Sequence, residues 1–144
     1  MLTRHQKTRF ASTFAGNPIA CAVAIAAMDV LLDEQLTERT HRLGKTVEQR
    51  LNAIRSPYFA GWRGRGLFFS LLVRDDAPPR VTAKRWARLL MERGVLTQDY
   101  GDRIRLAPPL CINESDLWRA IDEMETALGD LEGMERELVG RPVS

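Results

Sequence analysis

The residues best suited to chemistry stand just ahead of the first predicted helix. Ser12 and Thr13 supply two hydroxyl donors. Asn17-Pro18 is typical of a helix start, because Asn caps the first N–H groups and Pro tolerates the first helical position. Free N–H groups and the positive end of the helix dipole favour a bound anion at such a terminus. This stretch therefore predicts either an anion site or an ordinary capped helix entry.

Arg105 is the second candidate. It belongs to a predicted strand over residues 103–106, in which alternation puts Ile104 and Leu106 on one face and Arg103 and Arg105 on the other. A planar guanidinium can hold a carboxylate through two parallel hydrogen bonds, which Lys cannot do. The pattern by itself also fits an ordinary exposed charge on a strand.

Hydrophobic spacing predicts the elements that must position these residues. The expected order is helix, helix, strand, helix, strand, strand, helix, which indicates an α+β fold with a small, mainly antiparallel sheet covered by helices. The predicted helices are 18–32, 36–54, 81–93 and one after Asn113, and the predicted strands are 67–73, 95–97 and 103–106. The glycine-rich stretch before residue 67 is expected to be a bend-rich entry to the strand that follows.

The first helix is apolar on all sides, which indicates burial between layers or at a subunit interface, with Cys21 on a buried face. The second helix has one narrow apolar stripe, so Arg39 and the other residues off that stripe are expected to face solvent. The stretch from Gly133 to Ser144 is polar and is expected to fray.

Composition limits the function classes. The chain has 144 residues, enough for one ordinary domain, and its net charge of +2 is too small to indicate a nucleic-acid or membrane partner. No apolar run approaches the ~20 residues of a membrane span, and no secretory leader is recognisable. Cys21 and Cys111 lack metal-site spacing with each other or with the two His residues, and are expected to be reduced thiols of a cytoplasmic protein.

Three motifs resemble those of the class III pyridoxal-phosphate aminotransferases. They occur in the family's order and at about its separations: the Ser-Thr-Phe-Ala-Gly-Asn-Pro stretch at 12–18, Arg-Gly-Arg-Gly-Leu at 63–67, and Ile-Arg-Leu-Ala-Pro-Pro-Leu at 104–110. The Ala that closely follows Arg105 makes the chain most like the ornithine aminotransferase branch. The resemblance runs from Ser12 to Leu131 and corresponds to the C-terminal third of a family member.

The resemblance implies a domain division. Residues 1–35 would be a remnant of the large domain, carrying the Ser-Thr loop and a large-domain helix. Residues 36–132 would be the small C-terminal domain of a fold-type I aminotransferase, and residues 133–144 a frayed tail.

The resemblance also implies roles for individual residues. In the family, the Ser-Thr pair lies at the phosphate of pyridoxal 5'-phosphate, and its Thr reaches the cofactor of the neighbouring subunit. Ser12 and Thr13 match that pair, and Arg105 matches an Arg that contacts the substrate α-carboxylate. Two departures affect the first site: Ala15 replaces a Gly, and Phe10-Ala11 replaces His-Gly. Ala15 would be strained if that position needs a positive φ.

The family's Schiff-base lysine would lie upstream of this sequence, and none of Lys7, Lys45 and Lys84 matches it. We therefore expect the C-terminal portion of an ornithine aminotransferase-like transaminase, inactive alone, acting with an N-terminal half and forming homo-oligomers. Its reaction would transfer the ornithine amino group to a 2-oxo acid such as 2-oxoglutarate. The alternatives are a non-catalytic oligomerising or ligand-binding module, or a fragment of an acetylornithine or other class III aminotransferase. A reading frame for the N-terminal half directly upstream would favour the enzyme portion over the non-catalytic module.

Overall fold

The computed structural model describes residues 15–139, which divide into two units at Gln35/Leu36. In the first unit, helix α1 spans Pro18–Asp33, close to the predicted 18–32. None of its residues is buried, and Cys21 is exposed, so the predicted buried position of Cys21 is wrong within the described chain. The physical reason is that a single apolar helix has no second layer in its own unit to pack against.

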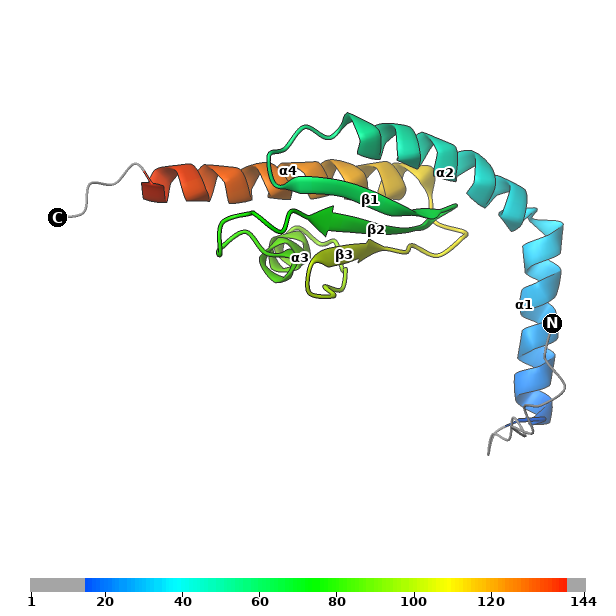
Figure 1. Ribbon diagram of the computed structural model, residues 1–144. Helices are drawn as coiled ribbons and strands as arrows, with labels where there is room; N and C mark the ends of the chain where they lie inside the picture. The colour runs from blue at the N-terminus through cyan, green and yellow to red at the C-terminus, as the bar shows by residue number, and fades with distance from the viewer. Residues whose placement is uncertain (1–14, 140–144) are drawn as a thin grey trace, which may run out of the picture. The chain divides into compact units, whose positions relative to one another are not determined.

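The second unit is α+β, as predicted. Its three strands form one antiparallel sheet in the order β1-β2-β3. Figure 1 shows α4 running behind this sheet and α2 beside β1. The elements are α2 (Leu36–Ala53), β1 (Phe59–Arg65), β2 (Phe68–Val73), α3 (Ala83–Glu92), β3 (Arg103–Leu106) and α4 (Glu114–Val139).

The helical stripes fall where the sequence predicts them. Alternate residues of β2 and β3 point into a single core, which α2, α3 and α4 close from one side of the sheet. The opposite face of the sheet is open, with Phe68 54% exposed. The fully buried large side chains are Leu43, Leu51, Phe69, Leu71, Trp86, Leu90, Ile104, Leu117, Ile121, Met124, Leu128 and Leu131.

Strand β1 is the main departure from the predicted order. It occupies the glycine-rich stretch expected to bend, and a register irregularity between Phe59 and Gly61 marks a bulge in its pairing with β2. Gly64 is required there, because a Cβ at this position would lie 2.2 Å from the carbonyl oxygen of Phe68. Gly64 thus permits close pairing of β1 with β2 at the sheet edge, where glycine and bulges are tolerated.

The predicted strand at residues 95–97 is also wrong. The chain runs beside β3 there without forming a ladder: the Arg105 N–H donates to the Gln98 carbonyl at 3.1 Å, and Asp99 and Ile104 form an isolated bridge. The predicted fraying from Gly133 is wrong as far as Val139, where α4 ends. A glycine costs a helix only about 1 kcal/mol, which the good helix formers after it offset.

Gly44 brings α2 against the turn between β1 and β2. A Cβ on Gly44 would lie 2.5 Å from the Gly66 carbonyl oxygen and 2.7 Å from the Gly66 Cα. Gly66 itself has a φ of +61°, a left-handed conformation that favours glycine. The helix and the turn thus touch backbone to backbone, which fixes α2 against the sheet.

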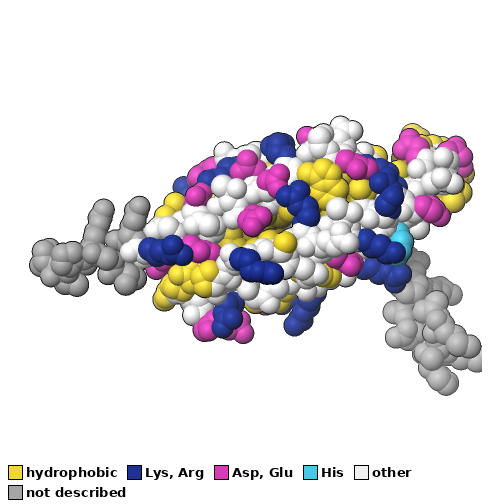
Figure 2. Space-filling view, turned by 90° about the horizontal axis from the view of Figure 1, so that it is seen from above, with side chains coloured by type: hydrophobic (Ala, Val, Ile, Leu, Met, Phe, Trp, Pro, Cys, Tyr) yellow, Lys and Arg dark blue, Asp and Glu magenta, His cyan; other side chains and the backbone are white. Residues whose placement is uncertain are grey.

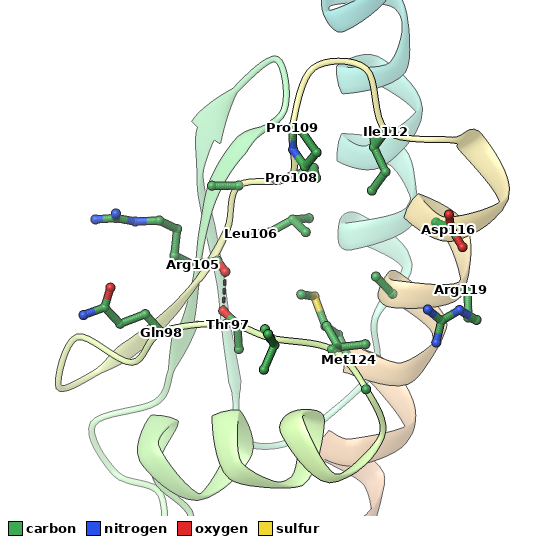
Figure 3. Close-up of a pocket in the computed structure, with 15 residues that line it drawn as sticks. Thr97, Gln98, Arg105, Leu106, Pro108, Pro109, Ile112, Asp116, Arg119 and Met124 are labelled. Carbon is green, nitrogen blue, oxygen red and sulfur yellow. Dashed lines mark hydrogen bonds between the residues drawn. The ribbon is translucent and has the colours of Figure 1, made fainter.

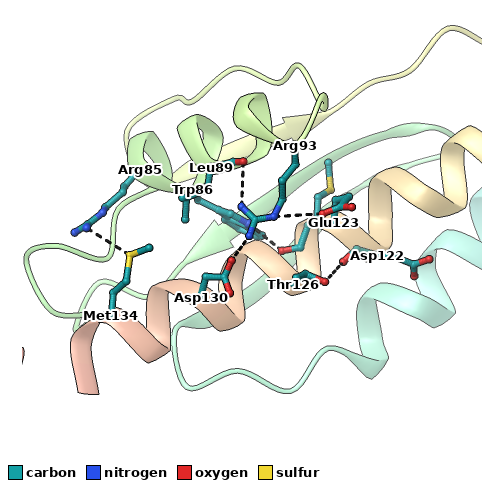
Figure 4. A network of polar contacts seen from close by, with 10 residues as sticks. Arg85, Trp86, Leu89, Arg93, Asp122, Glu123, Thr126, Asp130 and Met134 are labelled. Carbon is teal, nitrogen blue, oxygen red and sulfur yellow. Dashed lines mark hydrogen bonds and ion pairs between the residues drawn. The ribbon is translucent and has the colours of Figure 1, made fainter. Parts of the chain in front are cut away.

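Polar contacts tie α3 to α4 (Figure 4). The indole N–H of buried Trp86 donates to the Met124 carbonyl at 3.0 Å. Arg93, at the end of α3, forms ion pairs with Glu123 and Asp130 of α4. These contacts satisfy the one polar atom of Trp86 and two carboxylates at the rim of the core.

The described surface carries both charge signs. Figure 2 shows acidic and basic side chains interspersed over the visible face, without a large patch of one sign. Among the described helices, none is both long and apolar enough to span a membrane.

Candidate functional site

The Ser12-Thr13 pair lies outside the described residues, so its role remains a prediction. The described part of the motif is a capped helix entry. The Asn17 side-chain oxygen accepts from the N–H groups of Ile19 at 2.9 Å and Ala20 at 3.3 Å. These two donors are therefore already satisfied. Gly16, the residue after Ala15, has a φ of +75°, a left-handed conformation that favours glycine.

The backbone of Arg105 is held from both sides. On one side Arg105 is paired with Ser70 of β2. On the other, its N–H donates to the Gln98 carbonyl and its carbonyl accepts from the Thr97 hydroxyl. The predicted alternation is confirmed, because Ile104 and Leu106 are buried while Arg105 is only half-buried.

Two aromatic rings hold the Arg105 side chain. Its guanidinium carbon lies 4.2 Å from the centre of the Tyr100 ring and 5.1 Å from that of Phe68. Both distances are within the range of a cation–π interaction. Within residues 15–139, no acidic side chain forms an ion pair with Arg105. The fork is thus oriented but not neutralised, which leaves its N–H donors available for an anion.

Arg103 lies on the same face but is already committed. It forms a two-point ion pair with Asp102, at 2.7 Å and 2.9 Å. The hydrogen bonds donated by Arg103 hold the pKa of the Asp102 carboxyl below its usual value. The two arginines of β3 therefore differ in what they can bind.

A mostly apolar pocket of about 500 Å³ lies beside β3. Figure 3 shows Leu106 and Met124 pointing into this pocket, whereas the side chains of Arg105 and Gln98 point away from it. Arg105 contributes to the wall of the pocket but presents its charge on the other side. Apolar contact is therefore available on one side of β3 and a free guanidinium on the other.

Arg39 fixes the segment that follows the two prolines after β3. Its guanidinium donates to the carbonyl groups of Leu110 and Ile112. The expectation that Arg39 faces solvent is met only in part, because the half-buried side chain donates to backbone carbonyls that come 71 and 73 residues later. No local pattern marks such a contact; only the three-dimensional structure reveals it.

The described residues do not form a site for a cofactor that is held through lysine. Lys45 and Lys84 are both exposed and stand on α2 and α3, and neither lines the pocket beside Arg105. In the described part of the chain, no group of three or more His, Cys, Asp or Glu residues is placed to hold a metal ion.

Residues 2–128 match the family model described as aminotransferase class III. Among curated proteins, the chain is similar to the ornithine aminotransferase of Macrococcus caseolyticus (43% identity over 115 residues, 79% of this chain and 28% of that protein). It is also similar to that of Bacillus subtilis (42% over 118 residues, 81% and 28%). For the ornithine aminotransferase of Emericella nidulans, the identity is 36% over 121 residues, 83% and 27%. The chain thus spans just over a quarter of the length of these relatives.

Solved structures agree with the fold. The acetylornithine aminotransferase of Elizabethkingia anophelis superposes with a TM-score of 0.75 at 38% identity, covering 85% of this chain and 32% of that one. A PMP-bound aminotransferase from Vibrio fluvialis superposes with a TM-score of 0.74 at 28% identity, covering 81% and 27%.

Proposed function

The chain belongs to the class III aminotransferase family, and we propose that it is the C-terminal portion of an ornithine aminotransferase-like transaminase. The complete enzyme would transfer the amino group of ornithine to a 2-oxo acid such as 2-oxoglutarate. The observation that carries this proposal is Arg105, which stands at a motif position of the family with a guanidinium that is oriented yet unpaired within the described chain.

In this proposal Arg105 binds the α-carboxylate of the substrate. The Tyr100 and Phe68 rings restrict the guanidinium, so less side-chain entropy is lost when a carboxylate binds. The β2 pairing and the Gln98 and Thr97 contacts fix the backbone beneath it. The contribution of this chain is thus substrate orientation, since a held carboxylate places the rest of the substrate.

The family depends on pyridoxal phosphate, which when bound supplies an electron sink for the amino-acid carbons. We propose that Ser12 and Thr13 contact the cofactor phosphate. Because the described residues do not fit a lysine-held cofactor, no catalytic step is assigned to them. We propose that a chain of these 144 residues is inactive alone.

Further proposals follow from this one. A complementary N-terminal half is the partner, homo-oligomers form, and the protein is cytoplasmic. Residues 1–35 are a large-domain remnant and residues 36–132 the small domain.

Complementation tests the proposal. The chain would be co-expressed with the N-terminal part of Bacillus subtilis ornithine aminotransferase that its match leaves uncovered. Ornithine-dependent formation of glutamate from 2-oxoglutarate is expected from the pair and from neither part alone. Activity with acetylornithine but not ornithine would indicate the neighbouring branch. A stable, inactive pair would support the non-catalytic module.

A further inference from the structure

Arg105 does not stand alone on the open face of the sheet. The register places Arg63 of β1, Ser70 of β2 and Arg105 of β3 in one row across all three strands. Residues paired across strands share a face, so the three side chains rise on the same side. The next row holds Arg65 opposite Phe68, the residue whose ring supports Arg105.

The positive charge of this row is not neutralised by the described chain. Within residues 15–139, neither Arg63 nor Arg105 forms an ion pair, and Asp102, an acid close enough to Arg63 to feel its charge, is already paired with Arg103. The charge of Arg63 also helps to lower the pKa of Asp102. Two free guanidinium groups with a hydroxyl between them are suited to an anion of more than one charge.

We propose that the row Arg63–Ser70–Arg105 is a binding site for a small dianion, with the two guanidinium groups as its clamps and the Ser70 hydroxyl as a third donor. Neighbouring strands lie about 4.8 Å apart, so the backbones of the two arginines stand roughly 10 Å apart. Long side chains across that gap can close on one phosphate or hold the two ends of a short dicarboxylate. The role of Arg105 in this site rests on the proposed function, whereas the roles of Arg63 and Ser70 are additional to it.

The two arginine side chains differ in how firmly the fold holds them. Arg105 is half-buried and held between Tyr100 and Phe68, whereas Arg63 is exposed. Arg105 therefore anchors the first anionic group, and Arg63 recruits the second. A monoanion needs only Arg105. An anion affinity that depends on Arg63 therefore distinguishes a dianion site from a single carboxylate contact.

Calorimetric titration of the full 144-residue chain tests this site with inorganic phosphate, succinate and acetate. Phosphate and succinate should each bind more tightly than acetate, and Arg63→Gln should weaken both roughly tenfold, the loss of one charge-assisted contact. Arg63→Gln should leave acetate unchanged, while Arg105→Gln weakens all three. Arg88→Gln is the matched control, because Arg88 is an exposed arginine on α3 paired with Glu92.

Three results would overturn the dianion site. One is equal weakening by Arg88→Gln, which means only diffuse attraction to positive charge. Another is an affinity for phosphate and succinate that does not change in Arg63→Gln. The third is acetate binding as tightly as succinate. If acetate still depended on Arg105 in these cases, the carboxylate role of Arg105 in the proposed function would stand while the dianion site fell.

Discussion

Replacing Gly44 with Ala sets two effects of opposite sign against each other. In a helix interior, Ala is favoured over Gly by about 0.8–1.0 kcal/mol. The new Cβ, however, would lie 2.5 Å from the Gly66 carbonyl oxygen, 2.7 Å from its Cα and 2.9 Å from its carbonyl carbon. Ordinary contacts between such atoms begin near 3.5 Å. The overlap is with backbone, so rotation of a flexible side chain cannot relieve it.

The steric clash with Gly66 should outweigh the gain in helix propensity. Overpacking of a tight site typically costs about 1–3 kcal/mol, and a backbone contact belongs at the upper end of that range. Subtracting the gain in helix propensity leaves a net loss of about 1–2 kcal/mol for Gly44→Ala. Gly129→Ala is the matched control, because Gly129 also lies in a helix, α4, with nothing within 4 Å of its added Cβ. That variant should gain up to about 1 kcal/mol.

Urea unfolding followed by circular dichroism measures both variants. The midpoint should fall for Gly44→Ala and rise for Gly129→Ala, with the slope unchanged. A Gly44→Ala variant as stable as the wild type would refute the backbone contact between α2 and the β1–β2 turn. A loss in Gly129→Ala of similar size would show that glycine has another role in both helices.

Three further predictions concern charge, assembly and the cofactor. Arg103 lowers the pKa of Asp102 in the folded state, so the ion pair stabilises the fold above the ordinary Asp pKa of about 3.9, and this stabilisation is lost as the pH falls through the lowered folded-state pKa. The difference in unfolding free energy between wild type and Asp102→Asn should therefore shrink below about pH 4. A constant difference down to about pH 2 would contradict this. Since Val23 and Ile25 of α1 are 63% and 64% exposed, sedimentation on the order of ten micromolar should show self-association that Val23→Glu weakens, and a clean wild-type monomer would count against it. Borohydride treatment with pyridoxal phosphate should leave no single lysine fully labelled, whereas full labelling of one site would show that the chain holds the cofactor alone.

The sequence predicted the helices well because each one carries its own evidence. The stripes of α2, α3 and α4 repeat at helical spacing and their residues are buried as expected. Asn17 marked the start of α1 through its side chain. Strand β1 escaped prediction because Gly61 and Gly64 signal bends locally, and only pairing with β2 makes that segment a strand.

The candidate site was predicted in part. Its key side chain, Arg105, came from a motif, and its face came from alternation along β3. The aromatic support from Phe68 and Tyr100 could not be predicted, because one ring comes from a strand paired across the sheet and the other from a loop. The row that includes Arg63 likewise depends on the register of β1, a strand that local patterning did not indicate.

The central claim is that Arg105 holds a substrate carboxylate, and the complemented pair described above tests it through Arg105→Lys. That variant keeps the charge but loses the two-point fork, which should cost about 1.5–3 kcal/mol, or roughly ten- to a hundredfold in kcat/KM for ornithine. Arg103→Lys is the matched control on the same strand and face, since Arg103 is engaged with Asp102, and it should have little effect. A kcat/KM that is unchanged in Arg105→Lys, or that falls equally in both variants, would contradict the claim that Arg105 binds the substrate carboxylate.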